Sequence, residues 1–360
     1  MWVFETEVLA AHTNTQEERL LQVDVFVNLS QVVVGRKGKD INYVRDRTVS
    51  RNHCMFELNT ESGEGRPILT VKDLSSKTGT SVNGYKLAAG VERVLREGDE
   101  VHVGGGASKL KLKWQDVSIC FSASKSLDYS ARLKAIGVEV VQEWRATCHV
   151  LVMPKLTPTA KLLEAMLSCR PIVDEGWVEA LLNGPLCIRR LPLTDSYSPS
   201  LSMSLFSTVY EGSTAALTTV VPARRGLFSG CCFIVAGAEA KRYSSVIVTG
   251  GGKVFKLEGG HTAESLSAIM RSALSTRPAL SITPSWYMLI SRKAEKDTVD
   301  AYSALCNECG IALLKDDLFL RAIFAADSSL LSFVQSEGRK RKRGKGEGRG
   351  ERGGEKGGRR

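Results

Sequence analysis

The hydrophobic pattern of this chain changes near residue 115, and that change limits what the chain can fold into. Before it, short β-branched or alternating runs are separated by turn clusters, and Lys109–Trp114 alternates strictly between lysine and apolar residues. After it, compact apolar runs alternate with amphipathic stretches of helical period. The first pattern is typical of an antiparallel sandwich, and the second of a parallel sheet covered by helices. The 360 residues therefore hold at least two kinds of domain.

Residues 1–115 form the predicted all-β sandwich. Its other predicted strands are the short runs Gln31–Gly35, Cys54–Leu58, Ile68–Lys72 and Glu100–Val103. Clusters of turn residues, such as Asn59–Pro67, separate these runs. Short strands with turns at this spacing indicate two antiparallel sheets packed face to face.

Residues 116–195 and 226–330 form two predicted α/β units of similar plan, joined by a Pro/Ser-rich connector over residues 196–225. The predicted strands of the first unit are Val117–Phe121, Val138–Val141, His149–Met153 and Ile172–Val173, and its predicted helices are Asp128–Ile136, Thr159–Cys169 and Trp177–Leu182. The second unit returns to this order through the segments Cys232–Ala236, Lys241–Thr249, Lys253–Lys256, Glu264–Ser272, Leu280–Ile282 and Trp286–Ile290. The predicted fold class is multidomain: an all-β sandwich, two α/β repeats with small parallel sheets, and a basic tail.

The net charge of +10 is concentrated at the C-terminal end. Residues Gly338–Arg360 contain eleven Lys or Arg and three Glu, whereas all the preceding residues together carry a net charge of only +2. From Gly338 onward only Gly, Arg, Lys and Glu occur, and these residues cannot form a core. We therefore expect residues 331–360 to be a disordered basic tail.

The five consecutive basic residues of the tail have two interpretations. These residues are Arg339, Lys340, Arg341, Lys342 and Arg343. Such a run is typical of a nuclear-import signal, although a charge run can also be simply solvated. It could instead contact nucleic-acid phosphates weakly and without sequence preference, because the tail has no aromatic residue for base stacking. The near-neutral remainder of the chain argues against a nucleic-acid surface across the folded body.

Other functional classes find little support. The nine cysteines are scattered, and the pair Cys306 and Cys309 has no second pair at metal-ligand spacing, so neither a metal site nor a cofactor is expected. No HExxH, GxSxG or Walker pattern occurs, which argues against an enzyme. No run of eighteen apolar residues suggests a membrane span, and Met1–Leu9 lacks the basic start of a secretory signal.

Three motifs follow one another within the all-β part. They are Gly35-Arg36, Ser50-Arg51-Asn52-His53, and the stretch from Lys77 to Gly84. Together, at these separations, they resemble the FHA family, in which loops at one end of a sandwich bind a phosphorylated peptide. Arginines, hydroxyls and backbone N–H groups are the donors that a phosphate dianion requires.

The FHA resemblance implies a role for each of these residues. Arg36 and Ser50 would contact the phosphate with Arg51 beside them, while Lys77 and Thr78 would lie on the loop that touches phosphate and peptide backbone. The residues expected to brace the loops are Gly35, His53, Gly79, Asn83 and Gly84. Many FHA domains have Asn in place of Thr78, so affinity or selectivity is expected to differ, and the family implies a preference for phosphothreonine. In the plainer alternative, Arg36 and Arg51 are surface charges and Ser50 is a turn residue.

Residues 114–195 resemble a BRCT repeat. The residues that carry this resemblance are Cys120, Phe121, Ser122, Gly137, the strand segment 147–152 and Trp177. In phosphopeptide-binding BRCT repeats, a Ser or Thr ending the first strand and a Lys near the second helix hold the phosphate, and the matching residues here are Ser122 and Lys161. Ala123 stands where those repeats often have Gly, and it keeps the backbone N–H but crowds the approach. Alternatively, Ser122 caps a helix or turn and Lys161 is a solvated lysine.

Residues 226–326 resemble a second BRCT repeat more loosely. The resemblance lies in the segments 227–230, 250–253 and 284–286. Trp177 and Trp286 are expected to be core residues of the two repeats. Only Gln115 and Asp116 separate the last predicted sandwich strand from the first strand of the α/β part. Because flexible linkers are longer, we expect the FHA domain and the first BRCT repeat to pack as one unit.

An FHA domain followed directly by tandem BRCT repeats resembles the adaptor of the complex that senses and processes DNA double-strand breaks. This resemblance implies a non-enzymatic phosphopeptide-binding protein of the nucleus, chromosomes and damage foci, with roles in checkpoint signalling, telomeres and meiosis. The implied partners are phosphorylated chromatin and repair proteins, the double-strand-break nuclease with its ATPase partner, and a damage-signalling kinase. The alternative function is a nuclear scaffold that associates with nucleic acid through its basic tail.

Overall fold

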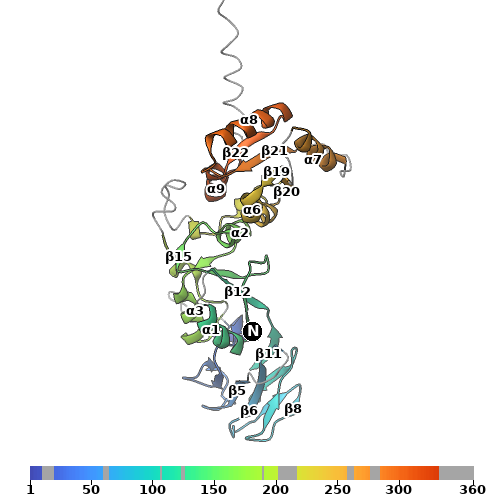
Figure 1. Ribbon diagram of the computed structural model, residues 1–360. Coiled ribbons are helices and arrows are strands. Elements are labelled where there is room, and N and C mark those ends of the chain that lie inside the picture. Colours follow the sequence, from blue (N-terminus) through green and yellow to red (C-terminus); the bar gives the residue numbers. More distant parts are fainter. Residues whose placement is uncertain are drawn as a thin grey trace, which may run out of the picture. The chain divides into compact units, whose positions relative to one another are not determined.

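A computed structural model describes residues 1–9, 20–59, 65–105, 108–122, 126–188, 190–201, 217–257, 263–275 and 284–331 (Figure 1). The chain divides into two compact units: Met1–Phe206 with Gly212–Val220, and Ser207–Glu211 with Val221–Arg360. Within the described residues, no helix is both long and apolar enough to cross a membrane. The predicted import signal Arg339–Arg343, and Ala123 of the predicted BRCT site, lie outside the described residues.

The first unit begins with a sandwich of two sheets. One sheet has the order β17-β2-β1-β11-β10-β7-β8, formed by β17 (Cys187–Ile188), β2 (Leu20–Phe26), β1 (Trp2–Leu9), β11 (Lys109–Trp114), β10 (Glu100–Val103), β7 (Thr80–Val82) and β8 (Tyr85–Lys86). The other has the order β4-β3-β5-β6-β9, formed by β4 (Ile41–Asn42), β3 (Gln31–Gly35), β5 (Cys54–Asn59), β6 (Ile68–Asp73) and β9 (Glu92–Val94). Apart from the parallel pair β3–β4, neighbouring strands in this sandwich run antiparallel.

Buried and exposed residues alternate along the sandwich strands, and this explains the period of two in the sequence. In β11, Leu110 and Leu112 are buried while Lys109 and Lys111 are exposed. The buried side chains of the two sheets meet in one core, where the rings of Phe4 and Phe56 lie 4.6 Å apart. The predicted all-β sandwich is therefore present.

The first α/β repeat follows β11 after two residues. Its parallel sheet has the order β13-β12-β14-β16, formed by β13 (Val138–Val141), β12 (Val117–Phe121), β14 (Val150–Val152) and β16 (Ile172–Val173). Its helices are α1 (Ser126–Ala135), α2 (Ala160–Leu167) and α3 (Glu175–Asn183). All five residues of the central strand β12 are buried, as a strand covered on both faces requires. Trp177 of α3 is buried, as expected.

Two small elements extend the first repeat into the predicted connector. A short strand, β18 (Ser200–Leu201), pairs in parallel with β15 (Lys155–Leu156), and a 3₁₀ turn, η1, covers Thr194–Ser196. The domain boundaries drawn from the sequence stay predictions, and residues 202–216 of the connector lie outside the described residues.

The second unit contains a parallel sheet of the same plan, in the order β20-β19-β21-β22. Its strands are β20 (Lys253–Leu257), β19 (Cys231–Ala236), β21 (Ser285–Ile290) and β22 (Ala312–Lys315), and its helices are α6 (Gly237–Thr249), α7 (Ala263–Ser275), α8 (Lys296–Cys309) and α9 (Asp316–Ala325). Two 3₁₀ turns, η2 (Pro222–Arg224) and η3 (Ser328–Leu331), flank these elements. The expected segment Leu280–Ile282 lies outside the described residues, and Trp286 is buried.

The glycine run of the second repeat has a packing role. A Cβ atom on Gly250 would lie 2.3 Å from the ring of Phe228, and Gly251 has a φ of +84° that side chains rarely adopt. Phe228 in turn stacks on Phe319 at 4.9 Å. The run therefore lets the α6–β20 turn close over an aromatic core.

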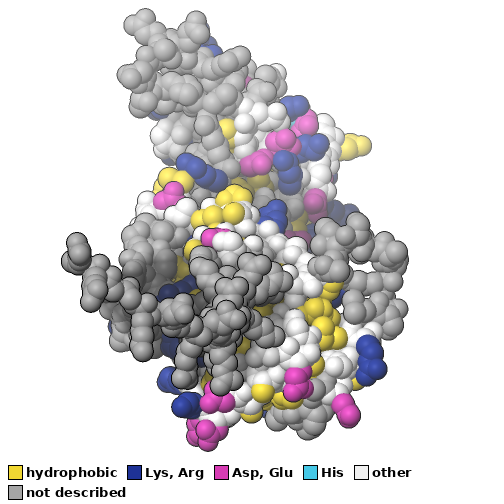
Figure 2. Space-filling view, turned by 90° about the horizontal axis from the view of Figure 1, so that it is seen from above, with side chains coloured by type: hydrophobic (Ala, Val, Ile, Leu, Met, Phe, Trp, Pro, Cys, Tyr) yellow, Lys and Arg dark blue, Asp and Glu magenta, His cyan; other side chains and the backbone are white. Residues whose placement is uncertain are grey.

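The charge distribution over the folded surface is mixed. On the face in Figure 2, Lys and Arg side chains of the described residues are interspersed with Asp and Glu side chains, and they form no continuous basic surface there. This agrees with a net charge that comes mainly from the C-terminal residues.

The sandwich and the first repeat share one core, which confirms that they pack together. Strand β17, which follows α3, pairs antiparallel with β2 of the sandwich. The Asn28 amide nitrogen donates to the Leu181 carbonyl at 2.8 Å and to the Pro185 carbonyl at 3.2 Å. The two modules are thus joined by a strand, a buried amide and a continuous apolar core.

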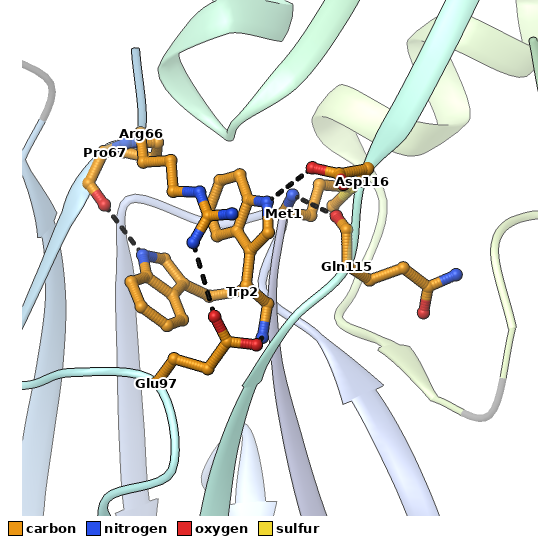
Figure 3. Close-up of polar contacts among 8 residues, drawn as sticks. Met1, Trp2, Arg66, Pro67, Glu97, Gln115 and Asp116 are labelled. Carbon is orange, nitrogen blue, oxygen red and sulfur yellow. Dashed lines mark hydrogen bonds and ion pairs between the residues drawn. The ribbon is translucent and has the colours of Figure 1, made fainter. Parts of the chain in front are cut away.

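A cluster of polar groups closes the same junction at the first residues of the chain (Figure 3). The Met1 amine donates to the Gln115 carbonyl at 2.7 Å and to the Gly137 carbonyl at 3.0 Å. Burial lowers the pKa of this amine to about 5. The indoles of Trp2 and Trp114 meet edge to face at 5.2 Å, and the guanidinium of Arg66 lies 4.6 Å from the Trp114 ring centre.

Candidate phosphate-binding sites

A hollow of about 790 Å³ lies where three loops of the sandwich meet. The loops precede β4, precede β5 and follow β6. Its lining residues include six basic side chains and no acidic one: Arg36, Lys37, Lys39, Arg47, Arg51 and Lys77. Ser50 lies among them. The structure therefore brings together four of the five predicted phosphate-contacting residues in one electropositive hollow.

Ser50 ties two of these loops together through its backbone and side chain. Its carbonyl accepts the Arg36 N–H at 3.0 Å, and its Oγ accepts the Lys77 N–H at 3.0 Å. Among the described residues, no acceptor is recorded for the Ser50 hydroxyl hydrogen. That hydrogen is therefore available to donate to an anion in the hollow.

His53 lies beneath the hollow and is fully buried. Its Nδ1 accepts the Ser50 N–H at 3.0 Å, and its Nε2 lies 3.0 Å from the Gly79 carbonyl oxygen and 3.1 Å from the Gly104 backbone nitrogen. The ring thereby joins the loop of Ser50 to the loop of Gly79. This is the geometry of a bracing residue rather than of a ligand.

Thr78, the fifth predicted contact, does not line the hollow. Its hydroxyl donates to the Thr48 carbonyl at 2.9 Å. The hydroxyl hydrogen is therefore committed within the protein, and toward a peptide Thr78 can offer only its oxygen lone pairs. This sharpens the expected difference from family members that carry Asn here, since Asn would add donors.

Four predicted bracing residues show why their identities matter. A Cβ atom on Gly35 would lie 2.1 Å from the Arg51 carbonyl oxygen, and Gly79 has a φ of +92°. Asn83 and Gly84, with φ of 53° and 84°, form the tight turn between β7 and β8. Asn83 also accepts the Glu100 N–H at 2.9 Å, which anchors this turn to β10.

Two aspartates that the motif analysis missed stabilise the loops of the hollow. Asp73 accepts hydrogen bonds from the hydroxyls of Ser76, at 2.7 Å, and Thr80, at 2.6 Å. Burial acts to raise the pKa of Asp73, but these hydrogen bonds outweigh it and hold the pKa below its ordinary value. Asp46 likewise accepts from Thr48 and Ser108. The spacing Asp-x-x-Ser at residue 73, typical of a side-chain turn, was the available sequence signal.

The first BRCT repeat brings Lys161 and Ser122 to one place. Ser122 follows β12 and is held by its N–H, which donates to the Val152 carbonyl at 2.9 Å. Lys161, in the first turn of α2, donates from Nζ to the Phe121 carbonyl at 3.0 Å. Both side chains are partly exposed, and two of the three ammonium hydrogens stay available for an anion. The pair lies at the carboxyl end of a parallel strand, where ligands of such sheets bind.

Among the described residues, the second repeat has no matching pair. Its central strand β19 ends at Ala236, and α6 begins directly at Gly237. The first turn of α7 contains Glu264 and no lysine. Among the described residues, the Ser and Lys pair therefore occurs in the first repeat only.

Comparisons with known protein families agree with this architecture. A model of the FHA domain matches residues 32–104. A model described as the BRCT domain of regulator of Ty1 transposition protein 107 matches residues 109–199. Both matched families are protein-interaction modules rather than enzymes.

Solved structures with the same fold include the FHA-BRCT1-BRCT2 domains of S. pombe Nbs1. That structure has a TM-score of 0.55 at 15% identity and covers 96% of this chain and 100% of its own. The structure of the S. pombe Nbs1–Ctp1 complex has a TM-score of 0.51 at 14% identity and covers 93% of this chain and 97% of that one. These similarities establish the fold: a sandwich followed by two BRCT repeats.

Sequence relatives point to one protein family. Nibrin of Danio rerio is 28% identical over 322 residues, covering 86% of this chain and 37% of that protein. Nibrin of Gallus gallus is 30% identical over 236 residues, covering 62% of this chain and 30% of that protein. The chain spans about a third of the length of these curated relatives. It is a relative of nibrin, built from an FHA domain followed by two BRCT repeats.

Proposed function

We propose that this protein is a phosphopeptide-binding adaptor that recruits a double-strand-break repair complex to phosphorylated partners. The observation that carries the proposal is the hollow at the loop end of the FHA sandwich, lined by six basic side chains and no acidic one. A phosphate dianion is the ligand that best compensates such a cluster.

Each group of the hollow has a distinct part in binding. The guanidinium groups of Arg36 and Arg51 would donate paired hydrogen bonds to phosphate oxygens, as arginine forks do. The uncommitted Ser50 hydroxyl would donate a further one. His53 and Asp73 keep the loops in place before the ligand arrives, which reduces the ordering that binding would otherwise require. The preference for phosphothreonine comes from the FHA family.

The first BRCT repeat would provide a second, weaker anion site. Lys161 supplies a positive charge and Ser122 a hydroxyl at the same strand end. Because the FHA domain and this repeat share a core, a ligand phosphorylated twice could engage both sites and gain affinity by avidity.

The cellular setting is proposed from the relatives. Relatives of this chain are nibrins, and S. pombe Nbs1 has been solved in complex with Ctp1. We extend to this chain a nuclear location at damaged chromosomes and a contribution to checkpoint signalling. Its partners would be phosphorylated chromatin and repair proteins, the double-strand-break nuclease with its ATPase, and a damage-signalling kinase. The five basic residues 339–343 would serve nuclear import.

Calorimetry with a phosphothreonine peptide and its unphosphorylated form tests the proposal. The native protein should bind only the phosphorylated peptide, and Arg36→Ala should weaken binding by about 1.5–3 kcal/mol because a charge-assisted contact is lost. Arg96→Ala is the matched control, since Arg96 is exposed and lies outside the hollow. Unchanged affinity in a folded Arg36→Ala protein would refute the assignment.

A further inference from the structure

The loop that supplies Ser50 also carries a pattern that the phosphate-binding role does not use. In the segment Arg45-Asp46-Arg47-Thr48-Val49-Ser50, arginines stand five and three residues before a serine hydroxyl. Arg45 and Arg47 are both exposed. Kinases that select substrates by charge recognise arginines at such positions through acidic subsites.

Two hydroxyls, those of Thr48 and Ser50, line the hollow, and Thr78 is hydrogen-bonded to Thr48, but the three hydroxyls differ in their hydrogen bonds. The Thr48 hydroxyl donates to Asp46, and the Thr78 hydroxyl donates to the Thr48 carbonyl. Ser50 is different, because its Oγ only accepts a hydrogen bond, from the Lys77 N–H at 3.0 Å. Its side chain is partly exposed at the wall of the hollow. Ser50 therefore combines two properties of a modification site: arginines precede it at the spacing that such kinases recognise, and its hydroxyl only accepts a hydrogen bond.

We propose that Ser50 is a phosphorylation site for an arginine-directed protein kinase, and that phosphorylation closes the FHA hollow to phosphopeptides. In the step, Ser50 Oγ forms a bond to the γ-phosphorus of ATP. The bond from that phosphorus to the β–γ bridging oxygen breaks, and ADP leaves. The hydroxyl proton passes to the base of the kinase and then to water.

The consequence follows from charge and rests on the proposed function. A phosphoserine carries a charge of about −1.5 to −2 and three acceptor oxygens. Attached to Ser50, it would lie beside Arg36, Arg51 and Lys77, the donors that an incoming phosphopeptide needs. The attached phosphate would pair with them in cis and repel a second dianion. The modification also removes the free Ser50 hydroxyl donor.

The experiment uses the full chain, a purified arginine-directed kinase and ATP. Phosphate would be mapped by mass spectrometry, with Ser50→Ala as the mapping control. Binding of a phosphothreonine peptide would be measured by calorimetry before and after treatment. We expect phosphate on Ser50 and a loss of affinity of about tenfold or more, as for loss of a charge-assisted contact. Excess phosphopeptide should protect Ser50 from the kinase.

Arg45→Ala separates the kinase pattern from the binding site. Arg45 does not line the hollow, so this variant should bind the phosphopeptide like the native chain and yet be phosphorylated much more slowly. An unmodified Ser50, phosphate placed on Thr48 instead, or a phosphorylated chain that binds peptide as tightly as before would overturn the inference. If the untreated chain binds no phosphopeptide, the proposed function and the closure fail together, while the mapped phosphate still decides the modification.

Discussion

The two BRCT repeats share a sheet order and differ where the central strand ends. In both, the first strand of the repeat lies second in a four-stranded parallel sheet, as the orders β13-β12-β14-β16 and β20-β19-β21-β22 show. In the first repeat, residues 122–125 separate β12 from α1, and Lys161 reaches the strand end. In the second, α6 starts at the residue after β19.

This difference shows how one fold can place a Ser and Lys pair at a strand end in one copy and not among the described residues of the other. The strands and their pairing are set by apolar burial, which both copies satisfy. The proposed anion site depends instead on a loop and two side chains, which the fold does not require. The first repeat differs further because it shares its core with the FHA sandwich.

Removing a core tryptophan should have the largest effect and should show whether the first unit unfolds as one body. Trp177 is fully buried in the core shared by the sandwich and the first repeat. Trp177→Ala should destabilise this unit by about 3–5 kcal/mol. Urea unfolding should show loss of the sandwich and of the first repeat at the same lowered midpoint. Phe319→Ala, in the second unit, should leave that midpoint unchanged.

Neutralising Lys161 should sharpen the contrast between the repeats. Lys161→Met keeps the stem and removes the charge, so binding of a phosphoserine peptide should weaken by about 1.5–3 kcal/mol. Stability should fall only by the lost hydrogen bond to the Phe121 carbonyl, about 0.5–1.5 kcal/mol. Lys241→Met, on an exposed position of the second repeat, is the matched control and should bind normally. Native binding by Lys161→Met, together with unfolding by Ser122→Ala, would mean that both residues are structural.

Substitution of Asn28 tests the buried link between the sandwich and the first repeat. Asn28→Ala removes the donor to the Leu181 and Pro185 carbonyls and should cost about 1–3 kcal/mol of stability, since it leaves these carbonyls without that partner. Gln22→Ala removes an exposed amide contact to Glu5 and should have little effect. Limited proteolysis should detect faster cleavage between residues 114 and 117 only in Asn28→Ala. Equal cleavage in both variants would count against the link.

Acidification should lower the stability of the first unit more than that of the second. Burial lowers the pKa of the Met1 amine from 8.0 to about 5, and burial together with Arg170 lowers that of His149. Between pH 5 and pH 8 the unfolded chain therefore binds more protons than the folded chain. The stability that these groups contribute to the first unit is fully present above pH 8 and is lost as the pH falls toward 5. In the second unit, burial raises the pKa values of Tyr243, Tyr287 and Cys306, so these groups titrate above this range. Urea midpoints measured across this range should fall more for the first unit.

Much of the fold could be predicted from local patterns. The alternation in Lys109–Trp114 and the apolar run Val117–Phe121 each correspond to a strand with the bounds predicted. The strands Trp2–Leu9 and Leu20–Phe26 were not predicted. The last elements of the second repeat, from Lys296 to Ala325, were also not predicted.

The hollow could be predicted only in part. Arg36, Ser50 and Lys77 were expected to meet because their motifs occur in a known order, and the structure places them around one hollow. The hydroxyl bond of Thr78 to the Thr48 carbonyl could not be predicted from spacing, whereas the Asp-x-x-Ser spacing at Asp73 did offer a signal for its turn. The contact between Thr78 and Thr48 joins loops that are distant in sequence, and such partners are selected only when the sheets have packed.

The sequence by itself determined the kinds of element, their order and the concentration of basic residues at the C-terminal end, since these depend on local composition and period. Only the tertiary structure decided that β17 joins the sandwich sheet, that Asn28 reaches the first repeat, and that Lys161 reaches the end of β12. Each of these contacts provides a hydrogen-bond partner for a polar group that would lack one when the apolar faces are buried. Because burial depends on the whole packed unit, local sequence does not determine these partners.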